Sequence, residues 1–148
     1  MLFLNKPDDF SPTCEMAMCI LDNHGQILIL KRHPDKHMGG FWDIPGGKIT
    51  KYESVTEALS REIFEETGLN IPPSALIFIA KTFIRYPEFD FISHVFYSRF
   101  SHKPENISIS RREHTEYKWV KYKDIDRVPF VPDELERIQL YTNKSISD

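Results

Sequence analysis

The sequence predicts a single α/β domain in which helices cover a mixed β-sheet. The 148 residues are close to the usual size of one domain and can bury a core of their own. Segments with strand patterning outnumber those with helical patterning, and a helix with well-defined ends interrupts the strands in mid-chain. The hydrophobic fraction of 41% and the charged fraction of 28% are typical of a globular protein and not of a disordered one.

The first third of the chain predicts a hairpin followed by a loop. Residues 15–21, rich in Met, Ala and Ile, are expected to form a strand, and Asp22-Asn23-His24-Gly25 has turn chemistry. The aliphatic run at 26–31 supplies the second strand of the hairpin. Residues 33–47 hold two prolines and four glycines, so we expect a loop there.

The clearest helix is expected from Ser54 to Thr67. Ser54 and Glu57 form a capping box, and Gly68 stands where a helix commonly ends on glycine. Two strands are expected next, at residues 76–86 and 89–100, then a polar loop at 101–112, a short strand at 117–121 and a last helix from Pro132 to about residue 141. We expect residues 1–12 and 143–148 to be terminal extensions of the domain.

Composition argues against several classes of function. The net charge of −3 gives no basic excess for wrapping a long nucleic acid. The longest aliphatic and aromatic run has six residues, 75–80, whereas a membrane span needs about 20. The N-terminus lacks the pattern of a secretory signal, and Cys14 and Cys19 are expected to point to opposite faces of one strand, so we predict a cytoplasmic protein with free thiols. The sequence specifies no oligomeric state.

The predicted helix carries carboxylates where its buried stripe should continue. Val55 and Leu59 begin this stripe, and Glu62, Glu65 and Glu66 follow on the same face. Like charges at this spacing destabilise a helix by about 0.2–0.5 kcal/mol per pair. Their place near the C-terminal end is also disfavoured by the helix dipole. Two interpretations remain, a solvated acidic face or a site for a hard divalent cation, Mg²⁺ or Mn²⁺.

The segment around this helix resembles the Nudix box of the Nudix (MutT-type) hydrolases. All nine defined positions match without a gap: Gly47, Glu53, Arg61, Glu62, Ile63, Glu65, Glu66, Gly68 and Leu69. A chance match is on the order of 10⁻¹⁰ per start position. Residues 41–46 and 117–120 also resemble the family, which extends the likeness over most of the chain.

The resemblance implies an α/β/α sandwich with a central mixed β-sheet and an enzyme that hydrolyses a diphosphate linked to another group. It implies that Glu62, Glu65 and Glu66 bind the metal, with the backbone carbonyl of Gly47 as a further ligand. Water attacks phosphorus in such a reaction, and a metal ion neutralises the phosphate charge and acidifies bound water. The expected cofactor is Mg²⁺, with Mn²⁺ as the alternative.

Further roles follow from the same resemblance. Arg61 is expected to pair with a box glutamate and hold its rotamer, and Glu53 to orient the loop before the helix. Family members often take the general base from outside the box. We expect Glu113 to be this base or an extra metal ligand, because a Glu-His pair is followed shortly by Trp119-Val120. Glu116 is the alternative.

Substrate contacts are expected from a basic rim and from the last helix. Arg32 and Lys48, with Lys31 and Lys36, either bind the substrate phosphates or lie in a solvated loop. Asp133 stands where some family members recognise a purine. The aromatic candidates for base stacking, each of which could equally belong to the core, are Trp42, Phe83, Phe89 and Phe130. A zinc site at His33 and His37 is disfavoured because no further ligands lie nearby in the sequence.

The leading hypothesis is therefore a Mg²⁺-dependent pyrophosphohydrolase that cleaves a nucleoside triphosphate or a related nucleoside diphosphate derivative. One alternative is a hydrolase of a nucleotide sugar or another diphosphate. Another is a Nudix module that senses a nucleotide without turnover, although a sensor has no need of a costly carboxylate cluster. In each case the partner is a small nucleotide.

Overall fold

The protein is a sandwich of two helices around one mixed sheet in the computed structural model, which describes residues 1–147 and the side chains of residues 1–143. The strands are β1 (Leu2–Phe3), β2 (Pro12–Asn23), β3 (Gln26–Arg32), β4 (Trp42–Asp43), β5 (Gly46–Lys48), β6 (Ile77–Arg85), β7 (Asp90–Arg99) and β8 (His114–Lys121). The helices are α1 (Val55–Thr67) and α2 (Glu134–Ser147), and the 3₁₀ turns are η1 (Pro73–Ala75) and η2 (Tyr122–Arg127).

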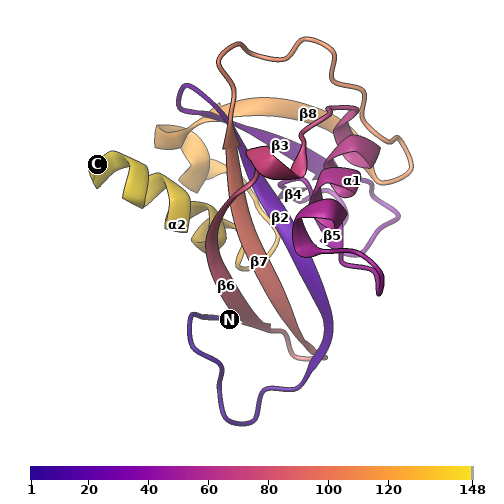
Figure 1. Cartoon of the computed structure of the whole chain (residues 1–148), viewed down its shortest axis with the longest axis vertical. Coiled ribbons are helices and arrows are strands. Elements are labelled where there is room, and N and C mark those ends of the chain that lie inside the picture. The colour runs from indigo at the N-terminus through magenta and orange to yellow at the C-terminus, as the bar shows by residue number, and fades with distance from the viewer. Residues whose placement is uncertain (148) are drawn as a thin grey trace.

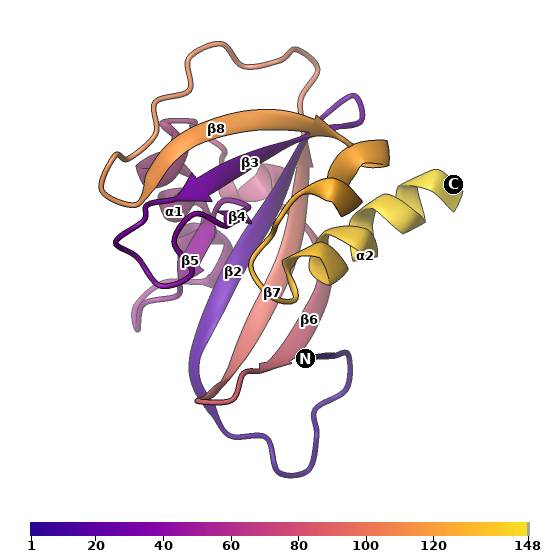
Figure 2. The same ribbon diagram turned by 180° about the vertical axis from the view of Figure 1, so that it is seen from behind.

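The sheet runs in the order β1-β6-β7-β2-β3-β4, with β5 paired to β2 and β8 paired to β3. β2 and β7 are parallel, whereas the other pairs are antiparallel. α1 and α2 cover opposite faces of this sheet (Figures 1 and 2). The predicted α/β/α sandwich with a central mixed sheet is confirmed.

β2 builds both halves of the core because its side chains alternate between the two faces. Ala17, Cys19 and Leu21 pack with Leu59 and Ile63 of α1. On the other face, Met18 and Ile20 pack with Ile138 and Tyr141 of α2. Cys14 is partly exposed and Cys19 is buried, and both are free thiols. One central strand therefore fixes α1 and α2 relative to each other.

Most of the predicted elements are present. α1 begins after Ser54, whose hydroxyl accepts a hydrogen bond from the Glu57 amide at 3.1 Å, and ends at Gly68, which has a φ of 75°. β8 starts at His114, three residues before the predicted strand, and α2 continues to Ser147, past its predicted end near residue 141. Residue 148 lies outside the described residues.

Three short strands differ from the sequence expectation. β4 and β5 lie within residues 33–47, which were expected to be loop, and β1 pairs with β6 where a terminal extension was expected. Strands of two or three residues are too short to show an alternating pattern, so their pairing partners define them. None of the helices in the described part of the chain is long and apolar enough to cross a membrane.

Candidate active site

The backbone of β5 passes directly beside the Glu62 carboxylate of α1. A Cβ atom on Gly47 would lie 2.4 Å from the carboxyl carbon of Glu62. A Cβ atom on Gly46 would lie 2.3 Å from the carbonyl oxygen of Ala17 in β2. Glycine is therefore required at position 46, where a Cβ atom would meet the β2 backbone, whereas at position 47 a Cβ atom would displace the carboxyl group of Glu62.

The three glutamates expected to bind the metal lie in very different surroundings. Glu66 is 5% exposed and accepts a hydrogen bond from the Gly46 amide at 2.8 Å. Burial raises the pKa of Glu66 well above its usual value, and the nearby Asp43 carboxylate raises it further. Burial also raises the pKa of the half-buried Glu62, against the opposing effect of Arg61. Glu65 is exposed.

Arg61 joins three of the box carboxylates, those of Glu53, Glu62 and Glu65. Its Nε and Nη2 atoms donate to the two oxygens of Glu53 at 2.6 and 2.9 Å. Its Nη1 atom donates to Glu62 at 3.0 Å and to Glu65 at 3.2 Å. These bonds to Arg61 lower the pKa of Glu53 to about 2. Glu53 also accepts from the Thr50 amide at 3.1 Å, so it orients both the loop before α1 and the guanidinium.

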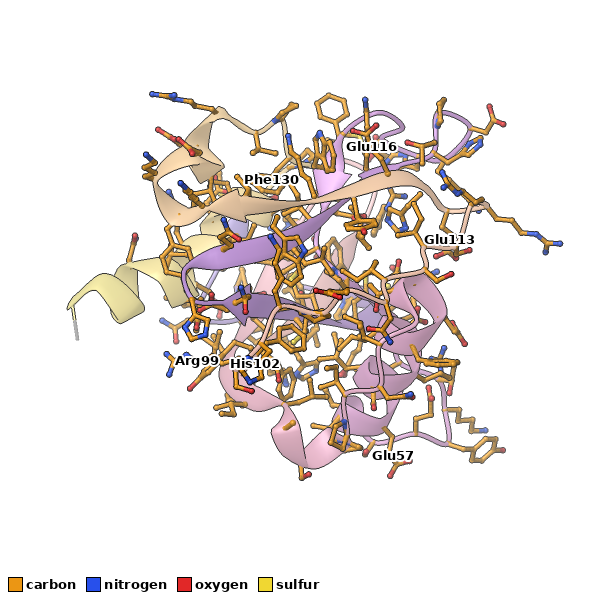
Figure 3. The ribbon with its side chains drawn as sticks, turned by 90° about the horizontal axis from the view of Figure 1, so that it is seen from above. Glu57, Arg99, His102, Glu113, Glu116 and Phe130 are labelled. Carbon is orange, nitrogen blue, oxygen red and sulfur yellow. The ribbon has the colours of Figure 1, made fainter. Side chains whose placement is uncertain are left out.

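The fold brings Glu113, and not Glu116, to the box. Glu66, Glu113 and His114 each offer a ligand atom, and these atoms lie within 4.8 Å of one another. Glu116 instead lies opposite Lys31 across the β3–β8 ladder. Figure 3 shows Glu113 near the end of β8 that lies beside α1, with Glu116 farther from that helix.

The donor set fits a hard divalent cation. Glu66 and Glu113 offer ligand atoms within 4.8 Å of each other, the Glu62 carboxyl group lies beside Gly47, and Arg61 joins Glu62 to Glu65. Oxygen ligands are those that Mg²⁺ and Mn²⁺ take. Burial raises the pKa of Glu66 against a single hydrogen bond from the Gly46 amide, so the protein supplies little compensation for its ionised form. A cation would supply it.

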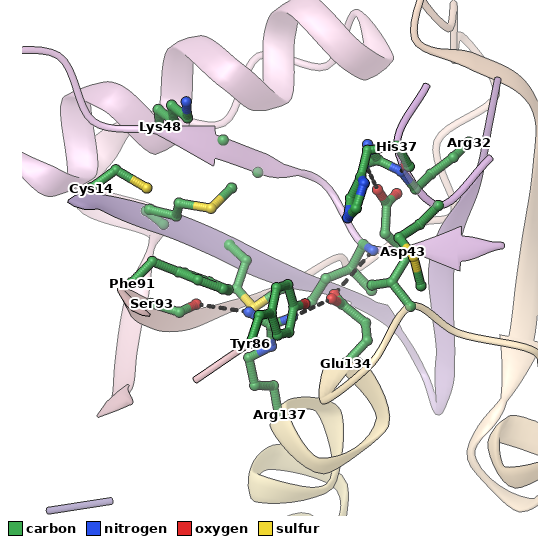
Figure 4. Close-up of a pocket in the computed structure, with 18 of the residues that line it drawn as sticks. Cys14, Arg32, His37, Asp43, Lys48, Tyr86, Phe91, Ser93, Glu134 and Arg137 are labelled. Carbon is green, nitrogen blue, oxygen red and sulfur yellow. Dashed lines mark hydrogen bonds and ion pairs between the residues drawn. The ribbon is translucent and has the colours of Figure 1, made fainter. Parts of the chain in front are cut away.

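A pocket of about 520 Å³ opens beside this carboxylate cluster. Glu66 and Gly47 belong to its lining, which joins the cluster to the pocket. Figure 4 shows Lys48 and Cys14 at one end, Arg32 and Asp43 at another, and a buried acid–base pair on the floor. This volume is within the range of small-ligand sites.

The comparisons with known proteins decide the family. A family model described as the NUDIX domain matches residues 14–141. The chain belongs to the Nudix family. A 61-residue stretch is 41% identical to the 8-oxo-dGTP diphosphatase of Proteus vulgaris, covering 41% of this chain and 54% of that protein. A 79-residue stretch is 33% identical to the RNA pyrophosphohydrolase of Pasteurella multocida (strain Pm70), covering 53% of this chain and 37% of that protein. The matches span about half or less of these curated relatives.

Solved structures share the Nudix fold over nearly the whole chain. The MutT protein from Methanosarcina mazei Go1 superposes with a TM-score of 0.75 at 26% identity, covering 93% of this chain and 96% of that chain. The NUDIX domain of Shewanella oneidensis NrtR, solved with ADP ribose, gives a TM-score of 0.77 at 18% identity, covering 95% of this chain and 94% of that chain. The second likeness concerns the fold alone.

Two of the three predicted substrate residues of this Nudix domain line the pocket. Arg32 lines the pocket, where it donates to Asp43 at 2.9 Å and to the carbonyl of His37 at 2.7 Å. Lys48 also lines it. Asp133 is not among the lining residues of this pocket; its carboxylate accepts from the ammonium group of Met1 at 2.9 Å, and the expected purine contact stays a prediction.

The aromatic wall of the pocket differs in part from the sequence expectation. Phe89 lines the pocket together with Tyr86 and Phe91, which the sequence analysis did not single out. The other aromatic candidates pack in the core or against it: Trp42, Phe83 and Phe130. The signal for Tyr86 and Phe91 was their position around the turn that joins two predicted strands.

The polar floor of the pocket, formed by Glu134 and Arg137, was not predicted from the sequence. Glu134 and Arg137 are both buried, and Arg137 Nη2 donates to Glu134 at 2.7 Å. Glu134 also accepts from the Ile44 amide at 3.2 Å, while Arg137 Nη1 donates to Ser93 at 3.2 Å (Figure 4). Burial raises the pKa of Glu134 to about 7, although Arg137 opposes the shift.

Substituting each glycine of β5 should separate metal binding from folding. In Gly47→Ala the new methyl group meets only the mobile end of Glu62, so the fold should survive while Mg²⁺ affinity falls by about 10-fold or more. In Gly46→Ala, the matched control, it meets the β2 backbone and should destabilise the fold by about 1–3 kcal/mol. Calorimetric Mg²⁺ titration and thermal unfolding measure the two effects. Unchanged Mg²⁺ affinity in Gly47→Ala would contradict the proposed proximity of metal and Glu62.

Glu134 should make stability fall as the pH rises. Its folded pKa of about 7 exceeds the value of 4.5 for an exposed glutamate, so the folded chain binds this proton more tightly than the unfolded chain. The free energy of unfolding of the wild type, relative to Glu134→Gln, should therefore fall by on the order of 2 kcal/mol between pH 5 and pH 8. Urea unfolding across this range measures the difference, and a difference that stays flat would contradict the shift.

Proposed function

We propose that this Nudix domain is a Mg²⁺-dependent pyrophosphohydrolase of a nucleoside triphosphate or a related nucleoside diphosphate derivative. The observation that carries the proposal is that Glu66, which lines a pocket sized for a nucleotide, offers a ligand atom within 4.8 Å of one on Glu113, while Arg61 holds Glu62 and Glu65 together on the same helix. Mn²⁺ is the alternative cation. The 8-oxo-dGTP diphosphatase among the relatives supports a triphosphate substrate.

In the proposed reaction, the carboxylates bind the cation and the pocket holds the nucleoside. Glu62, Glu65, Glu66 and Glu113, with the carbonyl of Gly47, would hold the ion, which when bound neutralises phosphate charge and acidifies water. Arg61 holds Glu62 and Glu65 in place through its Nη1 atom. Arg32 and Lys48 supply positive charge at the pocket wall, while Tyr86, Phe89 and Phe91 offer apolar surface to a base.

Glu113 is the proposed proton acceptor. Its carboxylate is exposed beside the buried Glu66, so water can reach it without leaving the cluster. The water oxygen forms a bond to phosphorus, its proton moves to Glu113, and the bond from phosphorus to the bridging oxygen breaks. A triphosphate would yield a nucleoside monophosphate and pyrophosphate.

Two other candidate functions can be distinguished from this one by experiment. One is hydrolysis of a nucleotide sugar or another diphosphate; the Shewanella oneidensis domain, which shares the fold, was solved with ADP ribose. A non-catalytic nucleotide sensor is the third candidate. Release of phosphate or pyrophosphate across a panel of triphosphates, nucleotide sugars and dinucleotides, with and without Mg²⁺, separates them, because a sensor would bind without release.

We also infer a cytoplasmic protein whose partner is a small nucleotide and not a long nucleic acid. The free thiols of Cys14 and Cys19 and the net charge of −3 support this inference.

Glu65→Gln should lower Mg²⁺ affinity and turnover together while the fold survives. The substitution keeps the shape of an exposed side chain, removes one charge from the cluster and relieves like-charge repulsion, so the melting temperature should stay the same or rise slightly. Glu57→Gln, on the first turn of the same helix, is the matched control and should keep wild-type turnover. Wild-type Mg²⁺ affinity together with wild-type turnover in Glu65→Gln would contradict a metal role for Glu65.

Glu113→Gln should lower kcat by about 10²–10⁴-fold, because it removes the proton acceptor. Its stability should change by less than about 0.5 kcal/mol, since the side chain is exposed. Glu116→Gln, three residues along and away from the cluster, should keep most of its activity. Steady-state kinetics and thermal unfolding measure both variants. Full activity in both would place the base elsewhere, and an exchange of the two behaviours would assign it to Glu116.

A further inference from the structure

His114 is a buried side chain whose two ring nitrogens have opposite surroundings. The side chain is 2% exposed, and its Nε2 atom lies 3.0 Å from Asp43 Oδ1. The other oxygen of Asp43 accepts from Arg32 at 2.9 Å. Because an ionised carboxylate can only accept hydrogen bonds, Nε2 carries the hydrogen in this pair. The neutral ring therefore presents a lone pair at Nδ1.

This lone pair faces another acceptor. Among the residues that the structure describes, Nδ1 of His114 is buried without a hydrogen-bond partner, and Glu66 Oε2 lies 3.7 Å away. A buried acceptor that faces a carboxylate is unfavourable unless a positive group lies between them. The distance is too long for a hydrogen bond. It suits two ligand atoms of one metal ion, since atoms bound at about 2.1 Å lie about 3–4 Å apart.

We propose that Glu66, Glu113 and His114 form a mixed nitrogen and oxygen site that binds a transition-metal ion such as Mn²⁺ in preference to Mg²⁺. All three ligand atoms lie within 4.8 Å of one another. Imidazole is a ligand of first-row transition metals, whereas Mg²⁺ prefers oxygen. The site shares Glu66 and Glu113 with the proposed hydrolase centre, so its location rests on that proposed function, while its preference for a metal follows from His114.

The hydrogen bond to Asp43 completes the arrangement. A metal-binding histidine commonly donates its second ring nitrogen to a carboxylate, which fixes the orientation and the tautomer of the ring. Asp43 does this for His114, and Arg32 in turn fixes Asp43. The ring is thus oriented with Nδ1 toward Glu66 before any ion binds.

The direct test is pulsed EPR of Mn²⁺ bound to the full chain without nucleotide. Two wild-type samples are compared, one with ¹⁴N-histidine and one with ¹⁵N-histidine. We expect nitrogen coupling to the Mn²⁺ electron spin that changes with the histidine label. This comparison needs no variant. Absence of histidine coupling would overturn the proposal, and it would indicate that a proton, and not a metal ion, lies between His114 and Glu66.

A matched variant tests the same point by affinity. In His114→Gln the amide can still donate toward Asp43, but no ring nitrogen faces Glu66. The Kd for Mn²⁺ should rise by about 10-fold or more, while that for Mg²⁺ should change by less than about threefold. His102→Gln, in the exposed loop before β8, is the control and should leave both affinities unchanged (Figure 3).

The possible results separate this proposal from the proposed function. An equal loss of Mn²⁺ and Mg²⁺ affinity in His114→Gln would make His114 a positioning residue and overturn the metal preference. Both metal measurements are made without substrate, so they stand whichever nucleotide is cleaved. Failure of hydrolysis across the nucleotide panel would reject the proposed function and leave the histidine coupling to be decided by EPR.

Discussion

The burial of the Glu66 carboxylate is the constraint on which the arrangement of the site depends. It lies at the C-terminal end of α1, where the helix dipole disfavours negative charge, and it has the carboxylates of Asp43 and Glu113 as neighbours. The Gly46 amide is a hydrogen-bond donor to it. This hydrogen bond requires β5 to run close to α1. β5 can do so because its glycines have no side chains that would separate it from the helix.

The remaining charges of the site are organised around this buried group. Arg61 neutralises the outer carboxylates, Glu53, Glu62 and Glu65, but the residues it contacts do not include Glu66. Positive charge from the protein therefore stabilises the rim of the cluster, whereas its interior has the weakly compensated pair of Glu66 and His114. A cation that binds in the interior adds stability where the protein supplies least, which couples metal binding to the stability of α1 and β5.

The sequence predicted the parts of this molecule that local chemistry defines. Ser54, Glu57 and Gly68 lie at the two ends of α1 and define them through local contacts. The structure has the helix where these residues indicate. β5 could not be predicted in this way, because it exists through pairing with β2, about 30 residues earlier in the chain. The carboxylate stripe was visible for a related reason, since an acidic group on an otherwise apolar face violates the helical pattern within one element.

The missed site residues lacked such a local contradiction. Glu134 and Arg137 are three residues apart with opposite charge, a spacing that is common on exposed helix faces, and only the packing of α2 under the sheet buries them. His114 is adjacent to Glu113 in the sequence, yet its contacts with Asp43 and Glu66 depend on the meeting of β4, β8 and α1. Asp133 was one residue away from the side chain that does line the pocket. Asp133 precedes the first residue of α2 and has a φ of 68°, so its side chain does not follow the direction set by the helix.

The pocket has two walls with different freedom to vary. One wall, formed by Gly46, Gly47 and Glu66, also belongs to the carboxylate cluster, so a change there alters chemistry and binding together. The opposite wall comes from Tyr86, Phe89 and Phe91, around the connection of β6 and β7. These rings contact one another, and they lie on β7 and on its connection to β6, away from the elements that carry the cluster. A substitution on the aromatic wall can therefore alter the contacts that the pocket offers to a ligand while the carboxylate cluster stays intact.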